Sequence, residues 1–268
     1  MTNQPFKAYE NIDFLNEHEA RPIRVLCELM EPDTRLEQQG IENTIVFFGS
    51  ARPKPHAEAK KALDDLLYSH PNEQSWCEDT KADIQKARRI LKLSEYYDKA
   101  VQLAEKVAEW GKNAKGKKYH VCSGGGPGMM EAANRGADNK KCKSIAYGIS
   151  LPFEQGVNNF ATPKLSFEFH YFFIRKFYFL YHAKAVVVFP GGFGTMDELF
   201  ETLTLIQTKK VNKVIPIYLF GIEFWEGLIN FRQFVDWGVI SPGDLDLFKV
   251  IDSVEEAFQL ITNDLSED

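Results

Sequence analysis

Two short segments of this chain place a glycine-rich loop between an apolar run and a helical pattern. The first extends from Ser123 to Glu131 and the second from Pro190 to Glu198. Glycine lets the backbone approach a ligand closely and adopt positive φ angles. The helix that follows presents unpaired N–H groups and the positive end of its dipole, which together favour an anion. Both segments are therefore predicted to hold a phosphate.

Neither loop is a standard nucleotide fingerprint. PGGFGT lacks the spacing and the lysine of a Walker A loop, and SGGGPGMM lacks the third glycine of G-x-G-x-x-G. These departures argue against a P-loop NTPase and against an NAD enzyme. Each loop taken alone could also be a tight turn that only allows close helix–strand packing. A further strand end, FFGSARP at residues 47–53, favours a shared ligand site.

Charged side chains near the second loop could take part in chemistry. Thr195 and Glu198 fit the T-x-x-E capping box, so Glu198 could serve only to cap a helix. Arg175 and Lys176 stand in the aromatic stretch HYFFIRKFYFLYHA, whose apolar residues on all sides indicate burial. A buried arginine needs an anionic partner, which is either a structural ion pair or a ligand.

Metal ligands and paired nucleophiles are not recognisable in the sequence. The histidines are scattered and form no H-E-x-x-H motif, and none of the cysteines forms a C-x-x-C pair. The cysteines are Cys27, Cys77, Cys122 and Cys142. We predict no metal and no cofactor, and we expect a reducing compartment.

Strands and helices alternate along most of the chain. Apolar or β-branched runs precede the glycine loops, and similar runs occur elsewhere in SIAYGISLP, KLSFEF, VIPIYLFG and FKVID. This alternation predicts an α/β fold with a mostly parallel sheet of about six or seven strands, covered by helices on both faces. Ligands of such folds bind at the carboxyl ends of the strands, where both glycine loops fall.

The chain is predicted to form one domain with an extension. Residues 41–268 form the domain, and residues 1–40 are expected to pack onto it, with Ile23–Leu29 as the best candidate for a short helix. Residues 54–95 are interpreted as a helical insertion with a polar loop at 69–80. No internal repeat is visible.

The composition of the chain argues against nucleic acid and membrane as partners. The net charge of −6 argues against a general nucleic-acid binder, and the 44% hydrophobic content of the 268 residues suffices for one sizeable core. No apolar run is long enough to span a membrane, and the N-terminal residues have no signal-peptide core. We therefore expect a cytoplasmic protein without nucleic-acid or membrane partners.

Four motifs in sequence order carry a family resemblance. SGGGPGMMEAANRGA, LPFEQGVN, FFIRK and PGGFGTMDELFETLTLIQT resemble the LOG ("lonely guy") family of Rossmann-like proteins over roughly residues 43–260. That family includes cytokinin riboside 5′-monophosphate phosphoribohydrolases, and many members were labelled possible lysine decarboxylases. The resemblance implies a Rossmann-like three-layer αβα fold. It also implies hydrolysis of the N-glycosidic bond of a purine nucleoside 5′-monophosphate, which releases free base and ribose 5-phosphate. No lysine stands in a pyridoxal-phosphate context, so decarboxylation is not expected.

The resemblance also implies roles for individual residues. Arg175 and Glu198 match the catalytic pair of the family. Residues matched to the phosphate-binding loop are Gly191, Gly192, Gly194 and Thr195. Residues at further ligand-contacting positions are Ser50, Gly125, Gly126, Glu154, Lys176, Asp197 and Thr204. A carboxylate such as Glu198 suits the oxocarbenium-like transition state of glycosidic cleavage. The pKa of Arg175 is too high for a general acid, so Arg175 is expected to act by electrostatic stabilisation or by clamping the phosphate.

Departures from the family leave the base open. Compact members carry Met-His before the residue that precedes Arg-Lys, where this chain has Phe172, Phe173 and Ile174, and they carry Glu-Glu where it has Asp197–Glu198. A cytokinin riboside monophosphate, AMP or another purine monophosphate could therefore be the substrate. The alternatives are a non-catalytic nucleotide-binding or carrier protein and a nucleotide sensor. The aromatic helix at 170–182 further predicts a homodimer with the active site near its interface.

Overall fold

A computed structural model describes residues 5–151 and 156–266 of the chain. Seven strands within these residues form one sheet in the order β4-β3-β2-β1-β5-β6-β7, and every neighbouring pair is parallel. In chain order they are β1 (Thr44–Phe48), β2 (His120–Ser123), β3 (Ser144–Ile149), β4 (Ser166–Phe169), β5 (Ala183–Val188), β6 (Ile217–Phe220) and β7 (Phe248–Ile251). The α/β fold predicted from the sequence is confirmed.

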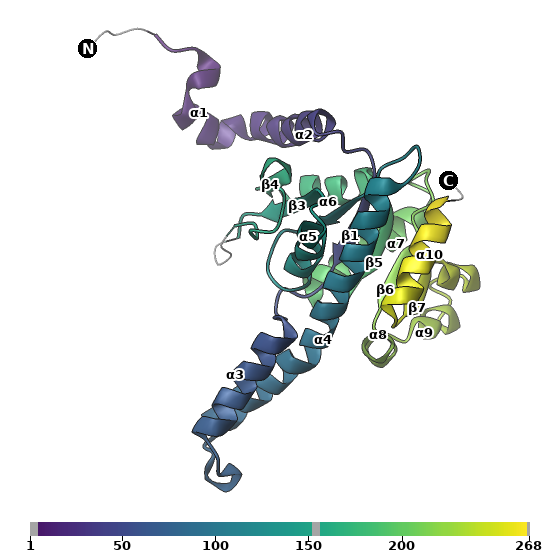
Figure 1. Cartoon of the computed structure of the whole chain (residues 1–268). Coiled ribbons are helices and arrows are strands. Elements are labelled where there is room, and N and C mark those ends of the chain that lie inside the picture. Colours follow the sequence, from purple (N-terminus) through teal and green to yellow (C-terminus); the bar gives the residue numbers. More distant parts are fainter. Residues whose placement is uncertain (1–4, 152–155, 267–268) are drawn as a thin grey trace.

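Helices pack on both faces of the sheet and make the three layers of a Rossmann-like fold (Figure 1). The helices on one face are α4 (Glu78–Asn113), α5 (Met129–Asn139) and α10 (Val254–Ser266). Those on the other face are α2 (Arg21–Gln38), α6 (Phe172–Tyr181), α7 (Phe193–Gln207) and α8 (Ile222–Leu228). The shorter or more peripheral helices are α1 (Ile12–Asn16), α3 (His56–Ser69) and α9 (Phe231–Asp236).

Strand β1 contributes side chains to the two hydrophobic cores, one on each face of the sheet. Successive side chains of a strand point to opposite faces of the sheet. Ile45 and Phe47 accordingly belong to the core beneath α4 and α5, whereas Val46 and Phe48 belong to the core beneath α6 and α7. A central parallel strand buries both faces, which explains the uninterrupted apolar run.

The order of the strands creates a switch point beside β1. The chain builds β1 to β4 in one direction across the sheet and then returns to place β5 on the other side of β1. Ligands of open α/β sheets bind in the crevice outside the carboxyl ends of the strands at such a point. The turn Gly49–Ser50 follows β1 and the loop that begins at Pro190 follows β5, so both border this crevice.

The N-terminal extension differs from the expected short helix. Helix α2 is 18 residues long and continues through Pro32, although proline removes one backbone hydrogen bond from a helix interior. Pro32 and Leu36 are buried, and this packing against the domain sustains the helix beyond Ile23–Leu29. Residues before α2 lie away from the sheet, and Phe6 and Ile12 are exposed there (Figure 1).

Helices α3 and α4 form a hairpin that extends beyond the sheet (Figure 1). It has a small apolar cluster of its own around Leu63, Ile84 and Ala87. The hairpin occupies the stretch predicted as a helical insertion, and its connection lies within the polar segment 69–80. Among the helices of residues 5–151 and 156–266, none has the length and apolar composition needed to cross a bilayer.

Candidate functional site

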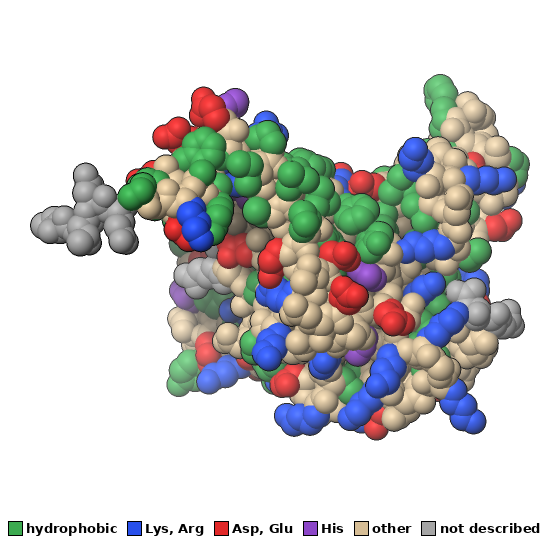
Figure 2. All heavy atoms as spheres, turned by 90° about the horizontal axis from the view of Figure 1, so that it is seen from above, with side chains coloured by type: hydrophobic (Ala, Val, Ile, Leu, Met, Phe, Trp, Pro, Cys, Tyr) green, Lys and Arg blue, Asp and Glu red, His purple; other side chains and the backbone are tan. Residues whose placement is uncertain are grey.

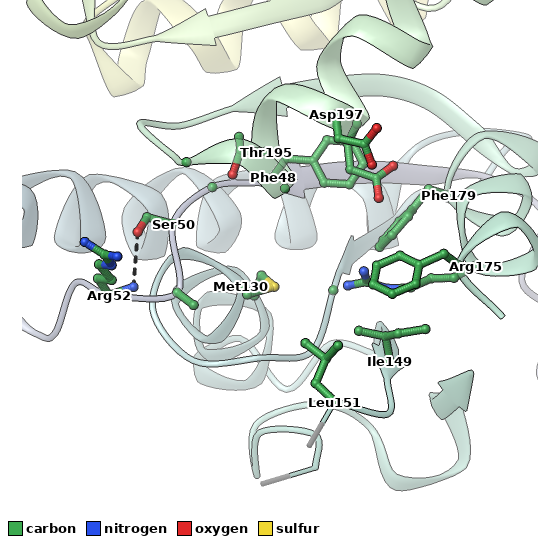
Figure 3. Close-up of a pocket in the computed structure, with 17 residues that line it drawn as sticks. Phe48, Ser50, Arg52, Met130, Ile149, Leu151, Arg175, Phe179, Thr195 and Asp197 are labelled. Atoms are coloured by element: carbon green, nitrogen blue, oxygen red, sulfur yellow. Dashed lines mark hydrogen bonds between the residues drawn. The ribbon is translucent and has the colours of Figure 1, made fainter. Parts of the chain in front are cut away.

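A cavity of about 370 Å³ lies at the carboxyl ends of β1, β2 and β3, beside the start of α7. Figure 3 shows Ser50 and Arg52 on one side of it and Arg175 on the other, with Thr195 and Asp197 along a third wall. The cavity therefore lies at the switch point, where the topology predicts a ligand.

The second glycine loop opens directly into this cavity. Helix α7 begins at Phe193, and Gly192 is its N-cap residue. Gly192 and Gly194 line the cavity, and a Cβ atom built on either glycine would meet no other atom within 4 Å. The first N–H groups of α7 have no partner within the helix, and they carry the positive end of its dipole. This loop has the space and the charge to hold a phosphate.

The helix-cap interpretation of Glu198 is wrong. Because α7 starts at Phe193, Thr195 is its third residue and Glu198 its sixth, and no side chain caps the helix. The sequence pattern fitted a capping box only under the assumption that Thr195 preceded the helix. Instead, Glu198 lines the cavity with a residue exposure of only 9%.

The electrostatic setting of Glu198 suits proton exchange near neutral pH. Burial raises the pKa of Glu198 to about 7, and the positive charges of Arg175 and Lys176 offset this effect only in part. The carboxylates of Glu201 and Asp197 add to the rise. A carboxyl group with a pKa near the working pH is efficient in general acid–base catalysis.

Arg175 of α6 lines the same cavity as Glu198. Its Nε donates a hydrogen bond of 2.7 Å to the Tyr147 carbonyl, and its guanidinium lies 5.0 Å from the centre of the Phe179 ring. A Cβ atom on Gly124 would come within 2.6 Å of Arg175 Nη2, so this glycine leaves room for the cation. The structure thus brings the two predicted catalytic side chains to one cavity.

Lys176 occupies a different place from Arg175. Its Nζ lies 2.8 Å from carboxylate oxygens of both Asp197 and Glu201. Burial lowers the pKa of Lys176, but these two ion pairs outweigh it and the pKa is raised. Lys176 and Thr204 line a neighbouring open depression and not the main cavity, whereas Asp197 borders both.

The first glycine loop contributes less to the cavity than predicted. Gly124 lines it, but Gly125 and Gly126 do not. Their carbonyl groups accept hydrogen bonds of 2.9 and 3.3 Å from the Asn158 amide, and the Gly125 N–H donates to Ser123 Oγ at 3.1 Å. The backbone groups of these two glycines thus form hydrogen bonds within the protein and do not border the main cavity.

A buried polar network continues from this loop into the domain. Asn158 Nδ2 also donates to Asn134 Oδ1 at 3.0 Å, and the same oxygen accepts from Ser123 Oγ at 2.7 Å. Asn134 Nδ2 donates to Ser144 Oγ and to the Ile145 carbonyl. Asn158 ends the motif LPFEQGVN but is not among the predicted site residues, because its partners come from distant segments.

Ser50 joins the loops that surround the cavity. Its N–H donates to the Pro190 carbonyl at 3.0 Å, and its carbonyl accepts from Met129 N–H at 2.9 Å. Its Oγ accepts a hydrogen bond of 3.1 Å from the Arg52 N–H, which is the dashed line in Figure 3. Ser50 thus lines the cavity, and its backbone hydrogen bonds hold the surrounding loops in place.

Two predicted site residues do not line the described cavity, and several residues that were not predicted do. Gly191 packs against Thr195 and does not line the main cavity, and Glu154 lies outside the described residues. Apolar and basic wall residues absent from the prediction are Arg52, Met130, Ile149, Leu151, Phe172 and Phe179. Within residues 5–151 and 156–266, no group of His, Cys, Asp and Glu side chains is arranged to bind a metal ion.

Comparison with known proteins finds similarity to one family. The family described as "Possible lysine decarboxylase" matches residues 130–261, which include Arg175 and Glu198. The chain is 25% identical over 146 residues to the probable cytokinin riboside 5′-monophosphate phosphoribohydrolase LOG4 of Oryza sativa subsp. japonica. It is 36% identical over 70 residues to the cytokinin riboside 5′-monophosphate phosphoribohydrolase LOG1 of Arabidopsis thaliana. These matches support the resemblance to the LOG family.

The match to these LOG relatives is partial. It covers 53% of this chain and 61% of the rice protein, and 25% of this chain and 32% of the Arabidopsis protein. Among solved structures, the molybdenum cofactor binding protein from Rippkaea orientalis has a TM-score of 0.46 and 16% identity, over 83% of this chain and 96% of that one. The molybdenum cofactor carrier protein from Chlamydomonas reinhardtii has a TM-score of 0.42 and 16% identity, over 84% and 99%.

Proposed function

We propose that this protein hydrolyses the N-glycosidic bond of a purine nucleoside 5′-monophosphate to free base and ribose 5-phosphate. The observation that carries the proposal is the buried carboxyl of Glu198, with its pKa raised to about 7, in one cavity with Arg175 and the open start of α7. A protein that only bound nucleotide would need the helix start but not this carboxyl. The names of the two plant relatives support the same reaction class.

The substrate phosphate fits the start of α7, where Gly192 and Gly194 leave open space beside unpaired N–H groups. Glu198 lies one turn further along the same helix, so the ribose would lie beside its carboxylate. The apolar side chains of Met130, Leu151 and Phe172 also line the cavity and offer surface for a base. These walls are compatible with adenine and with a modified adenine.

In the proposed reaction, a water oxygen forms a bond to C1′ while the bond from C1′ to the base nitrogen breaks. The Glu198 carboxylate stabilises the oxocarbenium-like ribose or takes a proton from the attacking water. The bond electrons leave with the base, which then gains a proton. Arg175 stabilises this developing negative charge without giving up its own proton.

The direct test is incubation of the purified protein with AMP, GMP and an isopentenyladenosine 5′-monophosphate. Free base is measured by chromatography and ribose 5-phosphate by a coupled assay. We expect Glu198→Gln to bind AMP with nearly unchanged affinity and to lose at least about a hundredfold in turnover. Glu226→Gln on α8 is the control, because Glu226 is exposed and does not line the main cavity.

The outcome separates the candidate functions. Base release by the parent protein that is lost in Glu198→Gln supports hydrolysis. Tight nucleotide binding with no base released from any of the three monophosphates would contradict hydrolysis and favour a binding or carrier protein. Equal turnover in the parent protein and in Glu198→Gln would remove Glu198 from the mechanism.

We also propose that the protein is a cytoplasmic homodimer. Phe173, Phe177 and Tyr181 form an exposed aromatic stripe on α6, the helix that carries Arg175. Hydrophobic side chains gather along the upper edge of Figure 2. Burial of such a stripe against a symmetry mate would place the site near the interface. A monomer mass by light scattering at micromolar concentration would contradict the dimer.

A further inference from the structure

The N-terminal extension makes a specific polar contact with the helix that carries Arg175. Glu28 of α2 accepts a hydrogen bond from His170 N–H to Oε1 at 2.7 Å and another from Tyr171 N–H to Oε2 at 3.2 Å. These two N–H groups immediately precede Phe172, the first residue of α6. A carboxylate at this position satisfies unpaired donors and complements the helix dipole.

Helix α6 has no equivalent group of its own. Its first turn contains no acidic residue, and its N-cap residue Tyr171 makes no side-chain capping bond. The carboxylate that stabilises the start of α6 therefore comes from a segment that is more than a hundred residues away in the sequence.

A short chain of hydrogen bonds connects Glu28 to Arg175. Glu28 accepts from the Tyr171 N–H, and the Tyr171 carbonyl accepts from the Arg175 N–H at 3.2 Å. At its other end, Arg175 Nε donates to the Tyr147 carbonyl. The backbone that supports the guanidinium is thus held from α2 on one side, while the side chain is held from β3 on the other.

Two further contacts fix α6 against α2. The Tyr178 hydroxyl donates a hydrogen bond of 2.6 Å to the Leu29 carbonyl, and the Arg21 guanidinium lies 5.6 Å from the centre of the Tyr171 ring. Glu28 and Leu29 are adjacent on α2, whereas Tyr171 and Tyr178 are two turns apart along α6. Because these contacts are two turns apart along α6, they restrain both sliding and rotation of α6 against α2.

We infer that Glu28 is a positioning residue for Arg175 and that it acts through the start of α6. The inference rests on the proposed function, and it gives the N-terminal extension a part in the active site. Loss of the carboxylate leaves two N–H groups without their acceptor and loosens the first turn of α6. A small displacement of a group that acts on the transition state is sufficient to slow the reaction.

Displacement of Arg175 has a second, measurable consequence at Glu198. The charged groups that act on Glu198 are Arg175 and Lys176 of α6, which lower its pKa, and Glu201 and Asp197 of α7, which raise it. When Arg175 moves away, the pKa of Glu198 rises further. The acid limb of the pH–rate profile then shifts to higher pH, because the carboxylate form is the active one.

The experiment compares Glu28→Ala and Glu28→Gln with the parent protein. We expect Glu28→Ala to lower kcat by about tenfold with KM changed by less than about threefold, and to raise the acid limb by about half a pH unit. Glu28→Gln keeps one oxygen acceptor, so it should recover part of the lost kcat. Glu31→Gln is the matched control, since Glu31 lies on the same helix and pairs with Arg35.

A second readout keeps this test independent of turnover. The pKa of Glu198 is followed without substrate by NMR of protein with labelled glutamate carboxyls, and Glu198→Gln assigns the signal. A raised pKa in Glu28→Ala but not in Glu31→Gln supports the inference even when no base is released, a result that would count only against hydrolysis. An unchanged Glu198 titration together with an unchanged kcat in Glu28→Ala would overturn it, whatever the loss of thermal stability.

Discussion

The two glycine loops look alike in the sequence but serve different physical purposes in the structure. In the first, the carbonyl groups of Gly125 and Gly126 accept hydrogen bonds from Asn158, and a Cβ atom on Gly125 would press against the side chains of Ala146 and Val157. In the second, Gly192 and Gly194 border open space inside the cavity. Glycines of the first loop permit close packing, whereas those of the second leave room for a ligand. A strand–glycine–helix pattern does not distinguish the two.

The polar groups of the two loops differ in the same way. The network of Ser123, Asn134 and Asn158 is buried or half-buried and supplies its own hydrogen-bond partners. Glu198, by contrast, is buried with its pKa raised, so its ionised form is poorly stabilised by the protein. Functional sites often retain such unfavourable groups at the expense of stability. The first loop is therefore expected to govern stability and the second to govern binding and chemistry.

The largest effect on stability is expected from Gly128→Ala in the first loop. Gly128 has a φ of 71°, and a Cβ atom there would overlap the Ser50 carbonyl. We expect a loss of about 3 kcal/mol in the free energy of unfolding, measured with urea. Gly192→Ala is the control from the second loop and should change stability by less than about 1 kcal/mol. Similar losses in both variants would contradict the division between the loops.

A smaller effect, with a defined pH dependence, is expected from Glu198→Gln. The folded protein holds a proton on Glu198 between its ordinary pKa and about 7, so the parent protein loses stability as pH rises through this window. The variant has no such loss. We expect it to be more stable than the parent by up to about 2 kcal/mol at pH 8 and nearly equal at pH 5. A difference that does not depend on pH would show that Glu198 titrates normally.

The smallest effect in free energy is expected for nucleotide affinity in Gly192→Ala. Its backbone φ of −95° tolerates alanine, but the new methyl group would enter the space assigned to the phosphate. We expect AMP affinity to fall about tenfold, or about 1.4 kcal/mol, by calorimetry. Gly227→Ala is the control, because Gly227 also faces open space but does not line the main cavity. Unchanged affinity in Gly192→Ala would move the phosphate away from this loop.

The sequence by itself determined the fold class and predicted which strand ends border the candidate site. Alternating apolar runs and helical patterns predicted the parallel sheet, because each pattern has the periodicity of its own element. The loops after β1, β2 and β5 were predicted to meet, since parallel strands end at one edge. The family motifs then identified Arg175 and Glu198, which the structure places in one cavity.

Only the tertiary structure decided which predicted residues face the cavity. Gly125 and Gly126 are hydrogen-bonded to Asn158 and do not line the cavity. Lys176 forms ion pairs with Asp197 and Glu201, and both sets of contacts join distant segments. The structure also showed that α7 begins before Thr195, so that Glu198 lies within the helix and is not part of a cap. The contact of Glu28 with the start of α6 likewise joins distant segments and could not be predicted from the sequence. Local sequence patterns specify elements, but burial and pairing across elements depend on how those elements pack.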